Sequence, residues 1–171
     1  MNPEFSRTFR LDELGTAPRA VAVVADEAER AALASRFGLL SIETLSATAD
    51  LTRDGDVVIA VGKLLAQVVQ ACVASGDPVP ASIAEDFALR FVPRAADPAA
   101  EEVELAEGEL DEIDYEGSAV DLGEAAAQTL ALALDPFPRS PTADEKLRAA
   151  GVIGEEEAGP FAALKALKDK L

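Results

Sequence analysis

The side chains that most often carry chemistry are limited here to carboxylates and one thiol: the chain has 32 Asp and Glu residues, a single cysteine, Cys72, and no histidine. The usual zinc ligand sets therefore cannot be assembled within one chain. Ser-His and Cys-His catalytic pairs are excluded for the same reason. No glycine-rich phosphate loop or dinucleotide fingerprint occurs. Carboxylate pairs remain, but surface acids mostly face solvent, so we predict no enzyme activity, no cofactor and no metal.

Cys72 has two interpretations. It is either a redox-active or metal-linked thiol, or a small buried hydrophobe in an apolar strand, which is the commoner role of a single cysteine. One cysteine forms no internal disulfide, and the chain shows no secretory signal and no run of about 18 uncharged apolar residues. These features predict a cytoplasmic protein without a membrane partner.

The negative charge is concentrated in one segment. The formal net charge is −17, and residues 95–135 contain 13 acids and no base. Such a segment repels phosphate backbones, so we expect no DNA partner and no broad RNA binding, while direct contact with RNA stays open. The segment is a solvated loop, or an acidic arm that engages and shields a basic protein. A calcium site is a third alternative, although EF-hand spacing is absent.

The predicted acidic arm consists of nine carboxylates that follow one another closely. They are Glu101, Glu102, Glu104, Glu107, Glu109, Asp111, Glu112, Asp114 and Glu116. Few aliphatic side chains lie among them, so we expect residues 95–120 to form a mobile loop. Any ordering of this loop is expected only when a partner is bound.

Apolar patterning predicts an α+β fold with a twisted, mostly antiparallel sheet in the first 93 residues. Alternating or compact apolar runs predict strands over residues 4–9, 19–25, 40–51, 56–61 and 83–91. Asp54-Gly55 predicts the hairpin turn before the fourth of these strands. Residues 62–73 fit both a helix and a strand, and their valines favour a strand.

Two helices are predicted to pack on this sheet. Asp26 begins the first with a capping-box pattern, and Gly38 ends it after Phe37. Asp121 begins the second, over residues 121–134, with acidic residues suited to the helix dipole. We therefore expect one domain over 1–138, followed by a helical tail over 139–171 with helices at 144–149 and 160–171.

Several short stretches match a known family in order and spacing. They include Glu4-Phe5-Ser6-Arg7, Val61-Gly62-Lys63-Leu64, Val69-Gln70-Ala71-Cys72-Val73, Asp121-Leu122-Gly123-Glu124 and Asp135-Pro136-Phe137-Pro138-Arg139. In these stretches the chain resembles the YceD family in its alphaproteobacterial-type form. The resemblance implies a cytoplasmic, non-enzymatic factor for synthesis, processing or stability of large-subunit ribosomal RNA. It also implies a basic ribosomal protein or pre-large-subunit particle as partner.

The motif positions supply six candidate binding residues. They are Gln70, Cys72, Asp121, Glu124, Asp135 and Arg139. On structural grounds alone, Asp121 is a helix N-cap and Arg139 pairs with a nearby acid. Many relatives carry two cysteines here, whereas this chain has Val69 in place of the first, so a metal or disulfide role for that pair does not transfer. The alternative function is a general acidic protein-binding module unrelated to ribosomes.

Overall fold

The computed structural model describes residues 3–94 and 110–152. Its elements are β1 (Thr8–Arg10), a 3-10 turn (Leu11–Glu13), β2 (Arg19–Val24), α1 (Glu27–Phe37), β3 (Ser41–Asp54), β4 (Val57–Ala71), β5 (Pro78–Pro93), β6 (Asp111–Tyr115), β7 (Ala119–Asp121), α2 (Leu122–Ala133) and α3 (Ala143–Ala149). The chain forms two compact units, Met1–Gln70 with Pro80–Asp135, and Ala71–Val79 with Pro136–Leu171.

Five strands form one sheet in the order β2-β3-β4-β5-β6, and the α+β prediction is confirmed. β2 pairs antiparallel with β3, and β3 with β4, whereas β6 runs parallel to β5. The β3–β4 hairpin turns at Gly55, whose φ of 61° suits a residue without Cβ. The ambiguous residues after Gly62 continue β4 as a strand up to Ala71, as predicted.

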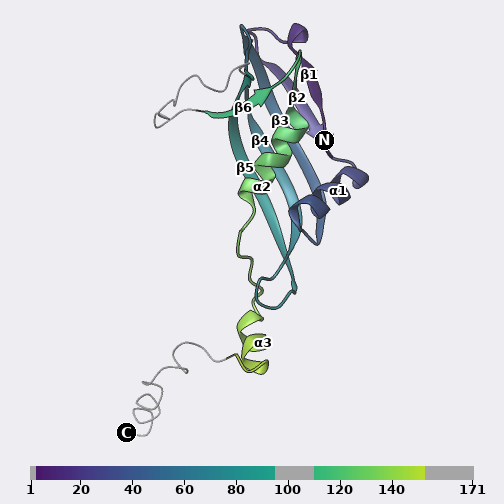
Figure 1. The fold of residues 1–171 in the computed structure, drawn as a ribbon, viewed down its shortest axis with the longest axis vertical. Helices are drawn as coiled ribbons and strands as arrows, with labels where there is room; N and C mark the ends of the chain where they lie inside the picture. The colour runs from purple at the N-terminus through teal and green to yellow at the C-terminus, as the bar shows by residue number, and fades with distance from the viewer. Residues whose placement is uncertain (1–2, 95–109, 153–171) are drawn as a thin grey trace, which may run out of the picture. The chain divides into compact units, whose positions relative to one another are not determined.

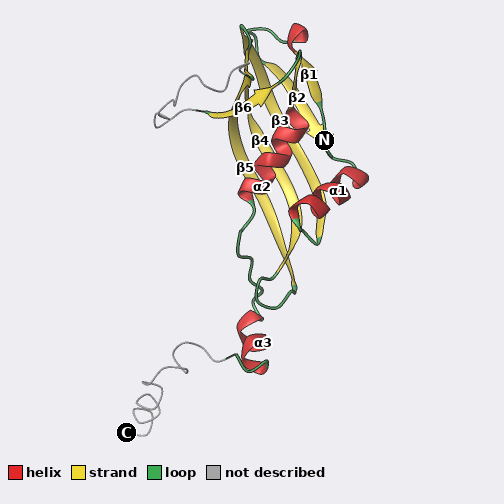
Figure 2. Cartoon of the chain, viewed as in Figure 1, coloured by secondary structure: helices red, strands yellow, loops and turns green. Residues whose placement is uncertain are grey.

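The helices bury their apolar sides against this sheet. α2 lies across one face of the sheet (Figure 1, Figure 2), and α1 packs against β3. One core cluster joins Leu33 of α1, Leu130 of α2, and Leu45, Leu64 and Phe91 of the strands. Removing these side chains from water is the main favourable contribution to folding, at about 25 cal/mol per Å² of apolar surface.

The start and end of α1 follow local sequence signals. The Asp26 carboxylate accepts a hydrogen bond from the Glu29 backbone N at 2.9 Å, and the Glu29 carboxylate accepts one from the Asp26 backbone N at 2.8 Å. This reciprocal capping box satisfies two backbone donors that the helix itself leaves unpaired. Gly38, with φ of 66°, ends the helix, so both predicted boundaries are confirmed.

The predicted loop over 95–120 is wrong at its C-terminal end, where residues 111–115 form β6 and 119–121 form β7. In β6, Ile113 and Tyr115 pack on the core and alternate with Glu112 and Asp114, which pair with Arg90 of β5 and with Arg94 just after it. β7 pairs with β1, Phe9 lying opposite Val120. Such pairings join segments far apart in the chain.

Strand boundaries also differ from expectation. The first strand begins only at Thr8, because its neighbour β7 is short. β5 begins at Pro78 instead of residue 83. A short helix, α3, forms where residues 144–149 predicted one. The helix predicted at 160–171 lies outside the described residues.

Candidate functional site

The described end of the acidic arm lies in and just after β6, at one edge of the sheet. Glu112 pairs with Arg90 on the neighbouring strand at 2.5 Å. Arg94 pairs with Glu116, and its Nε lies 3.9 Å from Asp114 Oδ2. These side chains are 45–69% exposed, so each pair contributes at most about 1 kcal/mol. Arg90 of β5 and Arg94 just after it thus pair with the arm's end without burying its charge. Glu101, Glu102, Glu104, Glu107 and Glu109 lie outside the described residues.

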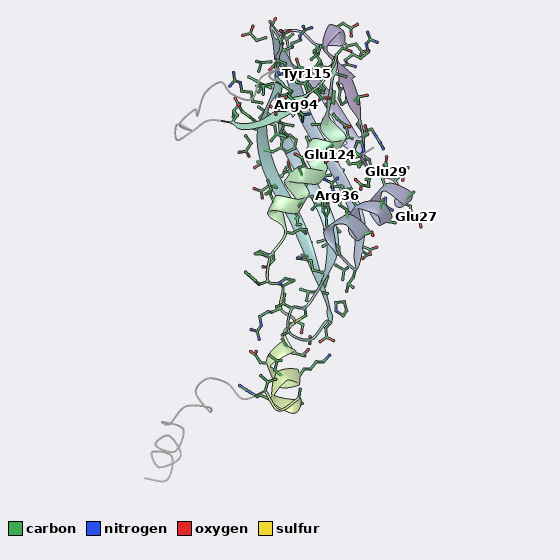
Figure 3. All side chains as sticks on the ribbon, viewed as in Figure 1. Glu27, Glu29, Arg36, Arg94, Tyr115 and Glu124 are labelled. Carbon is green, nitrogen blue, oxygen red and sulfur yellow. The ribbon has the colours of Figure 1, made fainter. Side chains whose placement is uncertain are left out.

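Tyr115 anchors β6 in the core. Its side chain is buried, and its hydroxyl donates a hydrogen bond to the backbone oxygen of Asp56 at 2.6 Å. Figure 3 shows Tyr115 and Arg94 at the same end of the sheet. A buried aromatic ring whose hydroxyl is hydrogen-bonded stabilises the position of a short strand. The acids of β6 are therefore held on a rigid element.

A groove lies between this edge and α2. It is lined by residues 85–89 of β5, residues 111–113 of β6 and five residues of α2 between Ala125 and Ala133, and we call it the edge groove. Phe87, Leu89 and Leu132 supply apolar surface. No lysine or arginine is among the described residues that line it. An apolar groove with an acidic rim suits a ligand that is both apolar and cationic.

Asp121 is held as a structural cap of α2. Its Oδ1 accepts hydrogen bonds from the backbone N of Gly123 at 3.0 Å and of Glu124 at 3.2 Å. The same carboxylate accepts from the Arg7 backbone N at 2.8 Å and from the Ser6 hydroxyl at 2.5 Å. Asp121 therefore ties the N-terminal segment to α2 in addition to capping the helix.

Glu124, in the first turn of α2, belongs to an ion-pair cluster. The Arg36 guanidinium donates to both Glu124 oxygens, at 3.0 and 2.9 Å, and to Glu4 at 2.9 Å. The Glu124 hydrogen bond, ahead of Glu4, raises the pKa of Arg36. Figure 3 shows Arg36 of α1 pointing toward Glu124 of α2. Bidentate arginine–carboxylate pairs fix orientation, so this cluster clamps α1 to α2.

Gln70 is buried near the end of β4. Its side-chain amide donates to the backbone oxygen of Asp135 at 2.8 Å, just after α2. This bond satisfies a buried amide and a carbonyl near a helix end, where carbonyls lack intrahelical partners. The two predicted candidates Gln70 and Asp135 are thus neighbours, joined by a hydrogen bond from the Gln70 side chain to the Asp135 main chain.

Cys72 and Arg139 lie in the second unit. The Ser75 hydroxyl, followed by the backbone N–H of Ser140, lowers the pKa of the Cys72 thiol to about 6. The Ser140 N lies 3.3 Å from the sulfur, which is buried. Arg139 pairs with Asp144 at the start of α3, at 2.5 Å. Hydrogen bonds that favour a thiolate lower its pKa, but burial limits its access to reagents.

The six motif candidates therefore fall into separate places. Asp121 and Glu124 share the start of α2, Gln70 touches Asp135, and Cys72 and Arg139 flank Ser140 in the second unit. Their binding roles stay predictions. Within residues 3–94 and 110–152, no three Asp, Glu or Cys side chains gather as a metal site. In the same ranges no helix is long and apolar enough to cross a membrane.

Sequence analysis did not single out the edge groove. Its clearest signal in the sequence is Leu132, a leucine outside the helix positions Leu122, Ala126 and Leu130 that are buried, and its side chain is 85% exposed. A large apolar residue on the outer side of an amphipathic helix is unremarkable alone. Beside an acidic sheet edge, the exposed Leu132 indicates a surface that can bind a ligand.

Together the fold and this edge define an acidic α+β protein with a surface groove suited to binding. The family model described as Large ribosomal RNA subunit accumulation protein YceD matches residues 60–168, more than half of the chain. The chain belongs to this family, whose name gives a role in the accumulation of large-subunit ribosomal RNA. The matched span includes β5, β6 and α2, which line the edge groove. No curated protein and no solved structure matches the chain significantly.

Proposed function

We propose that this protein is a cytoplasmic, non-enzymatic factor that supports large-subunit ribosomal RNA synthesis, processing or stability during ribosome assembly. It acts by contacting a basic ribosomal protein or a pre-large-subunit particle. Membership of the YceD family carries the ribosomal part of the proposal. The contact with a basic protein is supported by charge, because 13 acids and no base lie in residues 95–135.

Electrostatics favours a basic protein over naked RNA as the direct partner. A segment of this charge repels phosphates, whereas it attracts lysine- and arginine-rich tails from a distance and raises the association rate. A basic ribosomal protein that is shielded in this way is kept from nonspecific contacts before it reaches its RNA site. Loss of the factor then reduces the large-subunit RNA that depends on correct assembly.

The decisive experiment is depletion of the protein from its own cells, followed by measurement of the ratio of large- to small-subunit ribosomal RNA. We expect a selective fall in large-subunit RNA, together with abnormal large-subunit particles on a density gradient. Re-expression of the intact chain must restore the ratio. An unchanged ratio would refute the ribosomal role and favour a basic partner unrelated to ribosomes.

A charge variant tests the contact separately from the role. In it, Glu101, Glu102, Glu104, Glu107 and Glu109 are all replaced by glutamine. If the acidic arm engages the partner, this variant restores the RNA ratio poorly in depleted cells. A matched variant with glutamines or asparagines at Glu13, Glu43, Asp54, Asp56 and Glu145 loses the same charge elsewhere and should restore it well. Equal restoration by both would refute the acidic-arm contact and leave the family role in place.

A further inference from the structure

The edge of the sheet is only partly covered by β6. β6 pairs with β5 from Leu89 to Pro93, so the earlier part of β5 has no strand beside it among the described residues. The backbone N of Arg94 donates to Tyr115 O, so even-numbered backbone groups of β5 point toward the β6 side. Because strand residues alternate, the N–H and C=O groups of Ser82, Ala84 and Asp86 point to that open side too.

Unpaired strand edges usually carry protection against other chains. Here Pro78 and Pro80 protect the beginning of β5, since proline offers no N–H to an incoming strand. No proline occurs between residues 82 and 88. Among the described residues, the backbone groups of this stretch pair with no strand and can therefore accept one more.

The open stretch adjoins the edge groove. Phe87 and Leu89 of β5 are buried, whereas Leu132 on α2 is 85% exposed on the opposite wall. A strand laid along β5 would place alternate side chains toward α2, where they would cover Leu132. Burial of such a leucine favours binding, since an exposed apolar side chain gains most from removal of water.

The charged residues that line the groove are all acids. They are Glu85, Asp86, Asp111 and Glu112. Asp86 pairs with Lys63 at 3.2 Å and Glu112 with Arg90 at 2.5 Å, whereas neither Glu85 nor Asp111 has an ion-pair partner within the described residues. The last turn of α2, which also lines the groove, contains no basic residue. The carbonyl end of a helix carries partial negative charge, so α2 adds to the negative potential there.

We infer that the edge groove binds an extended, basic peptide segment that adds as a strand beside residues 82–88 of β5. Main-chain hydrogen bonds to β5 provide the register, apolar side chains cover Leu132, and lysines or arginines reach Glu85 and Asp111. The identity of the partner rests on the proposed function: if that function holds, the segment is a tail of a ribosomal protein.

The probe for this inference is a fluorescent peptide of alternating lysine and valine, with a glutamate–valine peptide as control. Ala84→Pro removes one N–H that faces the open edge, as Pro78 and Pro80 already do, and leaves the ladder to β4 intact. Ala84→Val keeps that N–H and serves as its matched control. Glu85→Lys with Asp111→Lys reverses the groove charge, and Glu43→Lys with Asp54→Lys makes the same net change elsewhere, from −17 to −13.

The expected result is a loss of about tenfold or more in affinity for Ala84→Pro and for the groove charge variant. Both matched controls should bind within about twofold of the intact chain. Hydrogen exchange should show new protection of the Ser82, Ala84 and Asp86 amides when the peptide is bound. Equal weakening by the Glu43 and Asp54 control would overturn the inference, because binding would then reflect diffuse charge. Edge amides that stay unprotected would also overturn it, because no strand would then pair with β5.

A cellular measurement separates this inference from the proposed function. If depletion lowers large-subunit RNA but Ala84→Pro restores it as well as the intact chain does, the edge groove is refuted while the function stands. If depletion leaves the RNA ratio unchanged, the function fails, and the peptide measurements alone decide whether the groove binds basic strands.

Discussion

Replacement of Asp121 by alanine tests how the start of α2 is held. The half-buried carboxylate caps the helix through two backbone N–H groups and also accepts bonds from the Ser6 hydroxyl and the Arg7 backbone N. Loss of an N-cap costs about 1 kcal/mol. Two further bonds contribute about 1 kcal/mol each. We therefore expect Asp121→Ala to lower the free energy of unfolding by about 3 kcal/mol.

The measurement is urea unfolding followed by circular dichroism, with the midpoint and slope compared between variants. Asp121→Asn is the matched control, since asparagine caps helices as well as aspartate and keeps an acceptor for Arg7. It should cost less than about 1 kcal/mol. A loss below about 1 kcal/mol for Asp121→Ala would refute the structural reasoning. If that variant also failed to restore ribosomal RNA, Asp121 would be a binding residue, as its motif position suggests.

Two further predictions concern close packing and pH. At Gly62, an added Cβ would lie 2.1 Å from the Thr48 backbone oxygen. Gly62→Ala should therefore lower the free energy of unfolding by about 3 kcal/mol or more in the same assay, because overpacking forces the backbone to move. A loss under about 1 kcal/mol would contradict this contact. The Cys72 thiol has a folded-state pKa of about 6, below its ordinary value of 9.0. The thiolate's contribution to stability is therefore fully present above pH 9 and is lost as the pH falls toward 6. No histidine titrates in this window, so Cys72→Ser should flatten the pH dependence of the unfolding midpoint, and an unaltered profile would argue against a lowered pKa.

Local signals predicted the elements whose structure depends on neighbouring residues. The capping box at the start of α1 involves only Asp26 and Glu29, which lie three residues apart, and Gly38 alone marks the end of the helix. The Asp121 cap of α2 was predicted for the same reason. Each of these signals satisfies backbone groups at a helix end, and no distant residue is needed to form it.

Long-range pairings escaped prediction because their partners are far apart in the chain. β6 is only a five-residue strand with three acids, and it is held by the buried Tyr115 with its hydroxyl bond, by Arg90 of β5 and by Arg94 just after β5. An isolated acidic segment of this composition predicts a loop. The edge groove depends on this pairing, since β6 supplies one of its walls. Sequence alone therefore identified the acidic charge but not the surface that orients it.

The acidic charge of the chain determines which partners can pair with the edge of β5. Residues 82–88 of β5 have no neighbouring strand on this side among the described residues. A strand edge of this kind invites pairing with a second copy of the chain, which is a common route to aggregation. With a net charge of −17, a second copy is repelled before its strand can align. The same field attracts a basic chain. The acids that disfavour self-pairing thus select the sign of the partner, which is why a charge reversal at Glu85 and Asp111 should both weaken binding of the basic peptide and increase self-association.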